Sequence, residues 1–232
     1  MENCETYLVV GSKSWNRRIF DEVICQFRGT WNFIHSPDEL TTESALKINP
    51  KFIFFLHWSW KVPEEIIKRF KCVCFHMADV PYGRGGSPLQ NLIIRGHRET
   101  KLTALQMVED FDAGPVYLQR PLILEGNAEE IYIRAGYLSA EMIKKIIDSN
   151  PEPKPQTGEP VIFQRRKPGQ SRIERHNSLH DLHDFLRMLD ADGYPKAFIE
   201  HKGFRYEFSR AAIYDGRIIA DVSIRQLEKD KT

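Results

Sequence analysis

The chain has 232 residues, of which 41% are hydrophobic and 28% are charged. These proportions are close to the average of globular proteins, so we expect one full α/β domain with a small appendage. The 33 basic and 32 acidic residues nearly cancel, which argues against a protein that binds nucleic acid through broad charge attraction.

The first half of the chain alternates short apolar runs with helical patterns. Strands are predicted at residues 7–10, 31–35, 52–56 and 72–75, and helices at residues 15–27, at 40–48 and from Pro63 onwards. Strands separated by helices of this length favour an open, mostly parallel, Rossmann-like sheet with helices on both faces.

The second half begins with a polar, glycine-rich loop at residues 77–87. Further predictions are helices at 88–95 and 127–149, and strands at 103–108 and 116–124. Residues 150–160 contain four prolines, so we expect an N-terminal catalytic domain (1–150), a proline-rich linker (151–160) and a small C-terminal α+β domain (161–232). In that last domain we expect a helix at 179–189 and strands at 197–201, 204–208 and 217–223.

Cysteine usage and the first residues indicate the cellular compartment. The four cysteines lack the paired spacing of a secreted disulfide scaffold, and the N-terminus MENCE lacks the pattern of a signal peptide. The longest apolar run, residues 52–56, is far shorter than the ~20 residues of a membrane span. The sequence therefore predicts a cytoplasmic protein that does not enter a membrane.

Two polar positions follow predicted strands, where open α/β sheets bind ligands. His76 is the first polar side chain after the fourth strand, and Asp112 lies in an Asp-Ala-Gly turn after the strand at 103–108. A histidine ending a strand is often structural, and an aspartate in such a turn often only closes it. Their joint placement favours a functional site.

Three motifs around these residues carry a family resemblance. The chain reads Cys74-Phe-His76, then VPYGRGGSP from Val80, then Asp112-Ala-Gly114. This combination resembles the folate-dependent formyltransferase family, which includes methionyl-tRNA formyltransferase and the sugar N-formyltransferases. Weaker similarity continues around Arg165 and Arg166.

The resemblance implies a formyl donor, an acceptor and an enzyme class. The donor would be 10-formyltetrahydrofolate, without a metal, and the enzyme an N-formyltransferase. The amino-acid sequence of residues 76–91 is similar to that of formyltransferases of pseudaminic-acid pathways. It implies that the acceptor is a nucleotide-linked amino sugar, such as a UDP-4-amino-4,6-dideoxy-acetamido sugar, used in surface polysaccharide biosynthesis.

The resemblance also implies roles for individual residues. Asp112 would take up the proton of the attacking amine, and His76 would face the oxyanion. The predicted folate-binding residues are Leu56, His57, Trp58, Trp60, Asp110 and Phe111. The predicted acceptor-binding residues are Arg84, Gly85, Ser87, Asn91, Arg165 and Arg166. The tryptophans also suit a core or lid, and the arginine pair also suits a solvated face.

Two positions depart from the family pattern. The catalytic asparagine of the family falls on Cys74, and a histidine often found in the strand before the aspartate falls on Leu105. A thiol is a weak hydrogen-bond donor, and one lost oxyanion donor costs ~10²–10³ in rate. These departures leave open a degenerate member that binds folate or a nucleotide sugar without turnover.

Other interpretations stay open beside these. Cys72, Cys74 and His76 share one strand face, but their spacing does not suit a zinc site, and a nucleophilic Cys74 beside an apolar strand would stay inert. A formyltransferase acting on an aminoacyl group is a further alternative. The near-neutral charge and the short second domain speak against a tRNA partner, so we expect no nucleic acid. A homodimer is compatible with the sequence.

Overall fold

The computed structural model describes residues 5–227 and contains two compact units. The first unit comprises the chain up to Gly85, Thr100–Leu122 and Ile133–Ile162. The second comprises Gly86–Glu99, Ile123–Tyr132 and the chain from Phe163 onwards. Of the four cysteines, Cys4 lies outside the described residues.

A six-stranded sheet in the order β2-β1-β3-β4-β6-β7 forms the centre of the first unit. The strands β1 to β4 pair in parallel and β6 is antiparallel to β4, so the predicted mostly parallel sheet is confirmed. Its strands are β1 (Thr6–Gly11), β2 (Thr30–Ile34), β3 (Phe52–Leu56), β4 (Lys71–His76), β6 (Glu99–Gln106) and β7 (Val116–Ile123).

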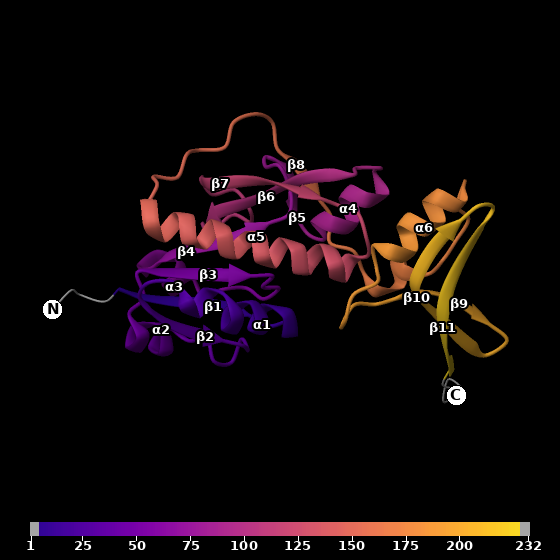
Figure 1. Ribbon diagram of the computed structural model, residues 1–232, viewed down its shortest axis with the longest axis horizontal. Helices are drawn as coiled ribbons and strands as arrows, with labels where there is room; N and C mark the ends of the chain where they lie inside the picture. Colours follow the sequence, from indigo (N-terminus) through magenta and orange to yellow (C-terminus); the bar gives the residue numbers. More distant parts are fainter. Residues whose placement is uncertain (1–4, 228–232) are drawn as a thin grey trace. The chain divides into compact units, whose positions relative to one another are not determined.

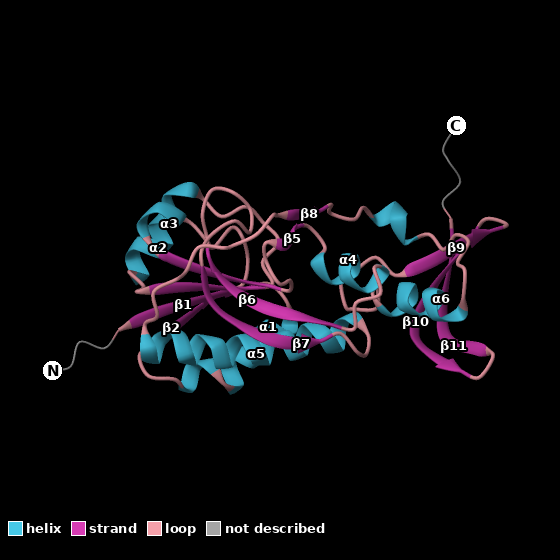
Figure 2. Cartoon of the chain, turned by 90° about the horizontal axis from the view of Figure 1, so that it is seen from above, coloured by secondary structure: helices cyan, strands magenta, loops and turns pink. Residues whose placement is uncertain are grey.

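Helices cover both faces of this sheet (Figures 1 and 2). On one face lie α1 (Ser14–Glu22) and α5 (Ala128–Ser149), and on the other α2 (Thr42–Ile48) and α3 (Glu64–Arg69). Successive strand residues point to opposite faces. Leu8 and Val10 accordingly pack with Ala45 and Ile66 of α2 and α3. The central strands β1 and β3 are buried on both faces, which explains their continuous apolar sequences.

Local structure differs from the prediction at several places in this unit, among them the strand predicted at 103–108, which runs from Glu99 to Gln106. The helix predicted at 15–27 ends at Glu22, because Val23 leaves helical geometry with φ −129°, and Ile24–Gln26 form a short 3₁₀ turn. The loop predicted at 77–87 contains a strand, β5 (Tyr82–Gly85), which pairs with β8 (Val161–Phe163).

The proline-rich segment 151–160 is hydrogen-bonded to the sheet. Lys154 donates its backbone N–H to the carbonyl of Val116 at 2.9 Å and accepts from the N–H of Val116 at 2.7 Å. The segment therefore runs along the surface of the first unit. The domain boundaries given from the sequence stay a prediction.

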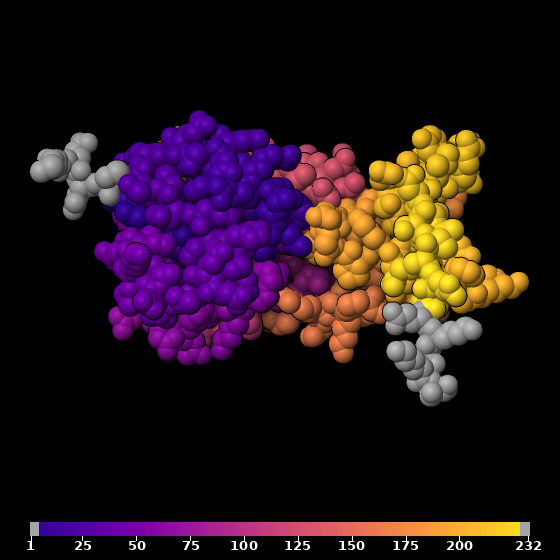
Figure 3. All heavy atoms as spheres, turned by 90° about the horizontal axis from the view of Figure 1, so that it is seen from below, coloured from indigo at the N-terminus to yellow at the C-terminus, as the bar shows by residue number. Residues whose placement is uncertain are grey.

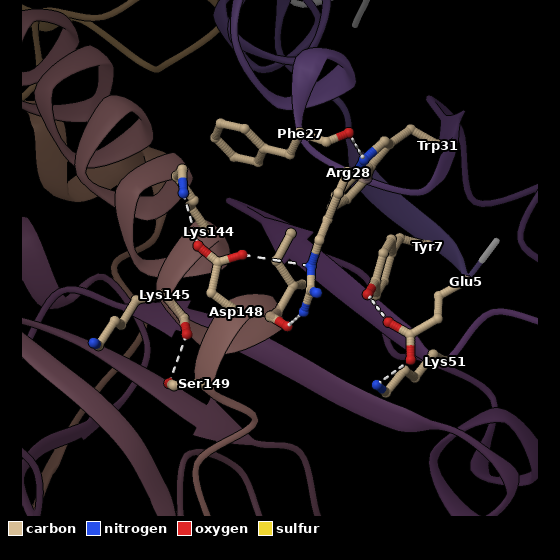
Figure 4. A network of polar contacts seen from close by, with 11 residues as sticks. Glu5, Tyr7, Phe27, Arg28, Trp31, Lys51, Lys144, Lys145, Asp148 and Ser149 are labelled. Atoms are coloured by element: carbon tan, nitrogen blue, oxygen red, sulfur yellow. Dashed lines mark hydrogen bonds and ion pairs between the residues drawn. The ribbon is translucent and has the colours of Figure 1, made fainter. Parts of the chain in front are cut away.

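Charged side chains form a network at the amino ends of the parallel strands (Figure 4). Tyr7 donates its hydroxyl to Glu5 at 2.5 Å, and Lys51 pairs with the other carboxylate oxygen of Glu5. Arg28 lies 3.5 Å from Asp148 near the end of α5 and donates to the carbonyl of Ile147. The network ties the starts of the strands to the C-terminal end of α5.

The second unit confirms the predicted α+β appendage. It holds α4 (Pro88–Ile94), a 3₁₀ turn (Pro168–Ser171), α6 (Leu179–Arg187) and an antiparallel sheet in the order β11-β10-β9. The strands are β9 (Ala197–His201), β10 (Phe204–Tyr214) and β11 (Arg217–Gln226). The two long strands β10 and β11 lie at the surface, in yellow in Figure 3.

Strand β10 continues past its predicted end at residue 208. A bulge between Ser209 and Ala212 shifts the register, and Arg210 there has φ +50°. The N–H of Arg210, freed from the ladder, donates to Asp190 at 2.7 Å. None of the described helices has the length and apolar character needed to cross a membrane.

Candidate active site

His76 lies at the end of β4 with only 7% of its surface exposed. Its Nε2 is 2.7 Å from the carbonyl oxygen of Gly83. Because a carbonyl oxygen only accepts, Nε2 carries a proton in this contact. The other ring nitrogen, Nδ1, faces Oδ1 of Asp112 at 3.4 Å. The structure thus brings together the two side chains on which the sequence analysis centred.

Asp112 is held in a tight loop between β6 and β7. Its backbone has φ +55°, a left-handed conformation that aspartate tolerates better than most residues. Its Oδ2 accepts a hydrogen bond from the N–H of Gly85 at 3.0 Å. A Cβ atom on Gly114 would lie 1.8 Å from the carbonyl oxygen of Gln106, so this close approach requires glycine.

The His76–Asp112 pair can hold one proton between two side chains. With the Nε2 proton directed at Gly83, Nδ1 of His76 and Oδ1 of Asp112 face each other at 3.4 Å, a place where one further proton can be accepted. The two side chains are only 8% and 17% exposed. A place that can take up and release one proton is what general acid–base chemistry needs.

A cavity of about 100 Å³ opens beside Asp112 in the first unit. Trp60 and Phe111 line it and are 47% and 76% exposed. The other lining residues are Lys61, Val62, Glu64, Ile67, Cys74, Gln106, Met107, Val108, Glu109 and Asp110. The cavity therefore offers apolar walls, exposed aromatic side chains and a carboxylate beside a buried histidine.

The predicted folate residues divide into two groups. Trp60, Asp110 and Phe111 line the cavity, whereas Leu56, His57 and Trp58 are not among its lining residues.

The three residues outside the lining have other surroundings. Leu56 is 2% exposed, and Trp58 packs against the core on the α2–α3 face. His57 has φ +50°, and burial, with a smaller contribution from the charge of Lys13, lowers its pKa to about 4.

Cys74, at the position of the family's asparagine, lines the same cavity as Asp112. It is the direct cross-strand partner of Leu105, so the two departures from the family pattern meet at one point of the sheet. Burial, and secondarily the charge of Asp112, raises the pKa of the Cys74 thiol. A protonated thiol is a weak donor and a poor nucleophile. Within residues 5–227, no group of three His, Cys, Asp or Glu side chains could hold a metal ion.

The predicted acceptor-binding residues are split between the units. Arg84 and Gly85 belong to the first unit, and Ser87, Asn91, Arg165 and Arg166 belong to the second.

In the second unit, the polar groups of this set contact the backbone. Asn91 donates its side-chain N–H groups to the carbonyls of Gly86, Ser87 and Gln164 at 3.0–3.1 Å. Ser87 accepts from the N–H of Arg166 at 3.0 Å. In this structure these two side chains hold the loop, and their predicted contacts with an acceptor stay a prediction.

One residue of the site was missed from the sequence. Gln156, in the segment predicted as a linker, donates its side-chain N–H groups to the carbonyls of Asp112 and Gly114, both at 2.8 Å. Its side-chain oxygen accepts from Arg84. A lone glutamine among prolines carries no local pattern that would mark it.

Comparisons with known proteins bear on this geometry. Residues 168–225 match the model of the methionyl-tRNA formyltransferase C-terminal domain. The structure of a methionyl-tRNA formyltransferase from Clostridium thermocellum is 44% identical with a TM-score of 0.91, over 96% of this chain and 99% of that one. The chain belongs to the formyltransferase family. The family prediction is thereby confirmed.

More distant relatives show how far the likeness extends. A curated methionyl-tRNA formyltransferase from Thermodesulfovibrio yellowstonii is 26% identical over 201 residues, covering 82% of this chain. The chain spans only 65% of the length of that relative. A 4-N formyltransferase from Francisella tularensis shares the fold, with a TM-score of 0.68 at 16% identity.

These comparisons correct the predicted acceptor. The relative at 44% identity and the curated relatives are methionyl-tRNA formyltransferases, whereas the sugar N-formyltransferases are only 16–18% identical. The prediction of a nucleotide-linked amino sugar in polysaccharide biosynthesis, and the exclusion of a nucleic-acid partner, were therefore wrong. The misleading signals were the loop at 76–91, which surrounds the reacting groups, and the net charge, which says nothing of local patches.

Proposed function

We propose that this chain transfers a formyl group from 10-formyltetrahydrofolate to the α-amine of an aminoacyl group carried by a tRNA, in the cytoplasm. The observation that carries the proposal is the His76–Asp112 pair beside a cavity with exposed aromatic side chains. The names of the relatives supply the acceptor class. From the sequence, transfer to an aminoacyl group was an alternative interpretation, and the near-neutral charge argued against a tRNA partner.

The cavity suits the flat ring system of a folate. Trp60 and Phe111 offer aromatic faces, and Val62, Ile67 and Met107 offer apolar walls. Residues 107–112 line the same cavity, and we expect backbone N–H and C=O groups of this stretch to meet the polar edge of such a ring. Ligand sites in general combine apolar walls with a few placed polar groups.

The transfer forms one bond and breaks another. The neutral amine attacks the formyl carbon, the new C–N bond forms, and the bond between that carbon and its donor nitrogen breaks. The amine loses a proton and the donor nitrogen gains one, so the reaction needs a group that accepts and returns a single proton. Oδ1 of Asp112 and Nδ1 of His76 can take up the proton that the amine loses and pass one proton on to the donor nitrogen, so the pair suits this task.

The oxyanion of the transfer also needs a hydrogen-bond donor. Cys74 is a weak one, and the Nε2 proton of His76 points at the carbonyl of Gly83. For His76 to stabilise the oxyanion, its Nε2–H must release the carbonyl oxygen of Gly83 and donate its hydrogen bond to the substrate oxygen instead. This exchange is part of the proposal, since buried donors aimed at developing charge are worth ~10²–10³ in rate.

A direct test is incubation with 10-formyltetrahydrofolate and methionyl-tRNA, followed by mass spectrometry of the released aminoacyl group. We expect a gain of one formyl group that depends on enzyme. Uncharged tRNA is the negative control, and free methionine tests whether the tRNA body is needed. Folate binding without formyl transfer to any aminoacyl-tRNA would instead support the non-catalytic alternative, which the Cys74 and Leu105 departures motivate.

A further inference from the structure

Gln156 makes hydrogen bonds to two parts of the candidate site at once. Its Nε2 donates to the carbonyl oxygens of Asp112 and Gly114, both at 2.8 Å. Its Oε1 accepts from Nε and Nη2 of Arg84 at 3.0 and 2.8 Å. All of these residues belong to the first unit.

Only an amide can make this set of contacts. Carbonyl oxygens accept and a guanidinium donates, so the bridging group must donate on one side and accept on the other. A carboxylate would keep the contact with Arg84 but would repel the two carbonyls. A purely apolar side chain of the same length would lose both halves.

The hydrogen bond from Gln156 adds a further contact that holds Asp112 in place. The carboxylate is held by His76 and by the N–H of Gly85, and the backbone carbonyl of the same residue is held by Gln156. Asp112 has a left-handed backbone, and such conformations persist only where the surroundings over-determine them. Gln156 supplies part of that constraint from a segment that is remote in sequence.

We propose that Gln156 is a positioning residue of the formyl-transfer site. It holds the Asp112 loop and the Arg84 guanidinium in a fixed relation from the segment 151–160. This inference rests on the proposed function for its effect on turnover. Its effect on the geometry of Asp112 does not depend on which acceptor the enzyme uses.

Two variants of Gln156 separate its two kinds of contact, the hydrogen bonds that it donates to Asp112 and Gly114 and those that it accepts from Arg84. Gln156→Glu keeps the acceptor for Arg84 and removes both donors, whereas Gln156→Met removes both halves at similar volume. The matched control is Gln119→Ala. Gln119 is also a part-buried glutamine of the first unit, but it donates to Asp79 and Thr103 and not to the Asp112 loop.

The first readout is hydrogen exchange of the Gly85 amide, which donates to Asp112 Oδ2. Loss of the two hydrogen bonds that Gln156 donates should speed this exchange at least about tenfold in both Gln156 variants. The Gln119→Ala protein should match the wild type. The side-chain Nε–H signal of Arg84 should stay protected in Gln156→Glu and lose protection in Gln156→Met.

The second readout is turnover. Both Gln156 variants should lower kcat by ~10²-fold, with KM for 10-formyltetrahydrofolate changed less than about threefold, because misplacement of a reacting group costs rate more than binding. Unchanged Gly85 exchange in both variants, or wild-type kcat, would overturn the positioning role. If the wild-type enzyme formylates no aminoacyl-tRNA, the exchange data still decide the role of Gln156, and the failure lies with the proposed acceptor.

Discussion

The two ends of the central sheet carry polar networks of opposite design. At the amino ends, each carboxylate has a cationic partner: Glu5 pairs with Lys51, and Asp148 pairs with Lys144 and Arg28. Hydrogen bonds from Lys51 and then Tyr7 lower the pKa of Glu5, and a hydrogen bond from Lys144 lowers that of Asp148. These side chains are 36–59% exposed, so water screens them.

In the second network, formed by His76 and Asp112, the Asp112 carboxylate is mostly buried and contacts a histidine. Among residues 5–227, no lysine or arginine lies within ion-pair distance of Asp112, and its titratable partner is His76. Carboxylates that are paired with cations stabilise the fold, whereas a buried carboxylate beside a histidine can accept and return a proton. We therefore expect the chemistry at the His76–Asp112 pair and not at the amino ends of the strands.

Removing the imidazole of His76 should cost as much activity as removing the carboxylate of Asp112. His76→Ala should lower kcat by ~10³-fold while the protein stays folded, because the pair loses its proton-sharing partner. The control is His35→Ala, which removes an exposed histidine that directly follows β2. Steady-state kinetics of formyl transfer measure both. Comparable turnover in the two variants would contradict a catalytic role of His76.

Gly114→Ala should disturb the loop that carries Asp112. The added Cβ would lie 1.8 Å from the Gln106 carbonyl oxygen, so the loop must shift. We expect a loss of about 1–3 kcal/mol in the free energy of unfolding and at least a tenfold loss of kcat. Gly169→Ala is the control, since a Cβ there meets no atom within 4 Å. Denaturant unfolding compares them; equal losses in both would mean that the close approach is unimportant.

Phe111→Ala should weaken binding of the formyl donor without changing the proton chemistry. The ring is 76% exposed where it lines the cavity, and a lost aromatic contact of about 1.4 kcal/mol corresponds to a tenfold rise in KM for 10-formyltetrahydrofolate. Tyr214→Ala, at a 52% exposed aromatic side chain of the second unit, is the control. A fall in kcat with unchanged KM would place Phe111 in the chemistry instead.

Lys51→Met should have the smallest effect and none on activity. The folded-state pKa of Glu5 lies below its ordinary value of 4.5, so its pairing stabilises the fold above that pH and loses its effect as pH falls. At pH 7 we expect a loss of at most about 1 kcal/mol, since the pair is partly exposed. The gap to wild type should close as pH falls below ~4. A gap that widens towards low pH would contradict this assignment.

Much of this architecture could be predicted from local patterns. The apolar runs at 52–56 and 72–75 correspond to β3 and β4, because strands buried on both faces need continuous apolar sequence. The meeting of His76 and Asp112 was predicted because each follows a strand within a family motif, and the structure places their side chains 3.4 Å apart. Their catalytic roles stay predictions.

What could not be predicted depends on contacts between remote segments. Gln156 reaches Asp112 across 44 positions, and nothing around it in the sequence marks that contact. Strand β5 forms within a glycine-rich stretch because β8 pairs with it, and Trp58 packs into the core although its neighbour Trp60 lines the cavity. The acceptor was mistaken because motifs near the reacting groups describe formyl transfer, which family members with different acceptors share.

The most direct measurement compares the same substitution at the two networks. Asp112→Asn and Asp148→Asn each replace a carboxylate by an amide of equal size, and each is assayed for formyl transfer from 10-formyltetrahydrofolate to methionyl-tRNA. We predict that Asp112→Asn loses ~10³-fold in kcat, while Asp148→Asn keeps wild-type kcat with slightly lower stability. Wild-type turnover in Asp112→Asn, or an equal loss in both proteins, would contradict the placement of the chemistry at the His76–Asp112 pair.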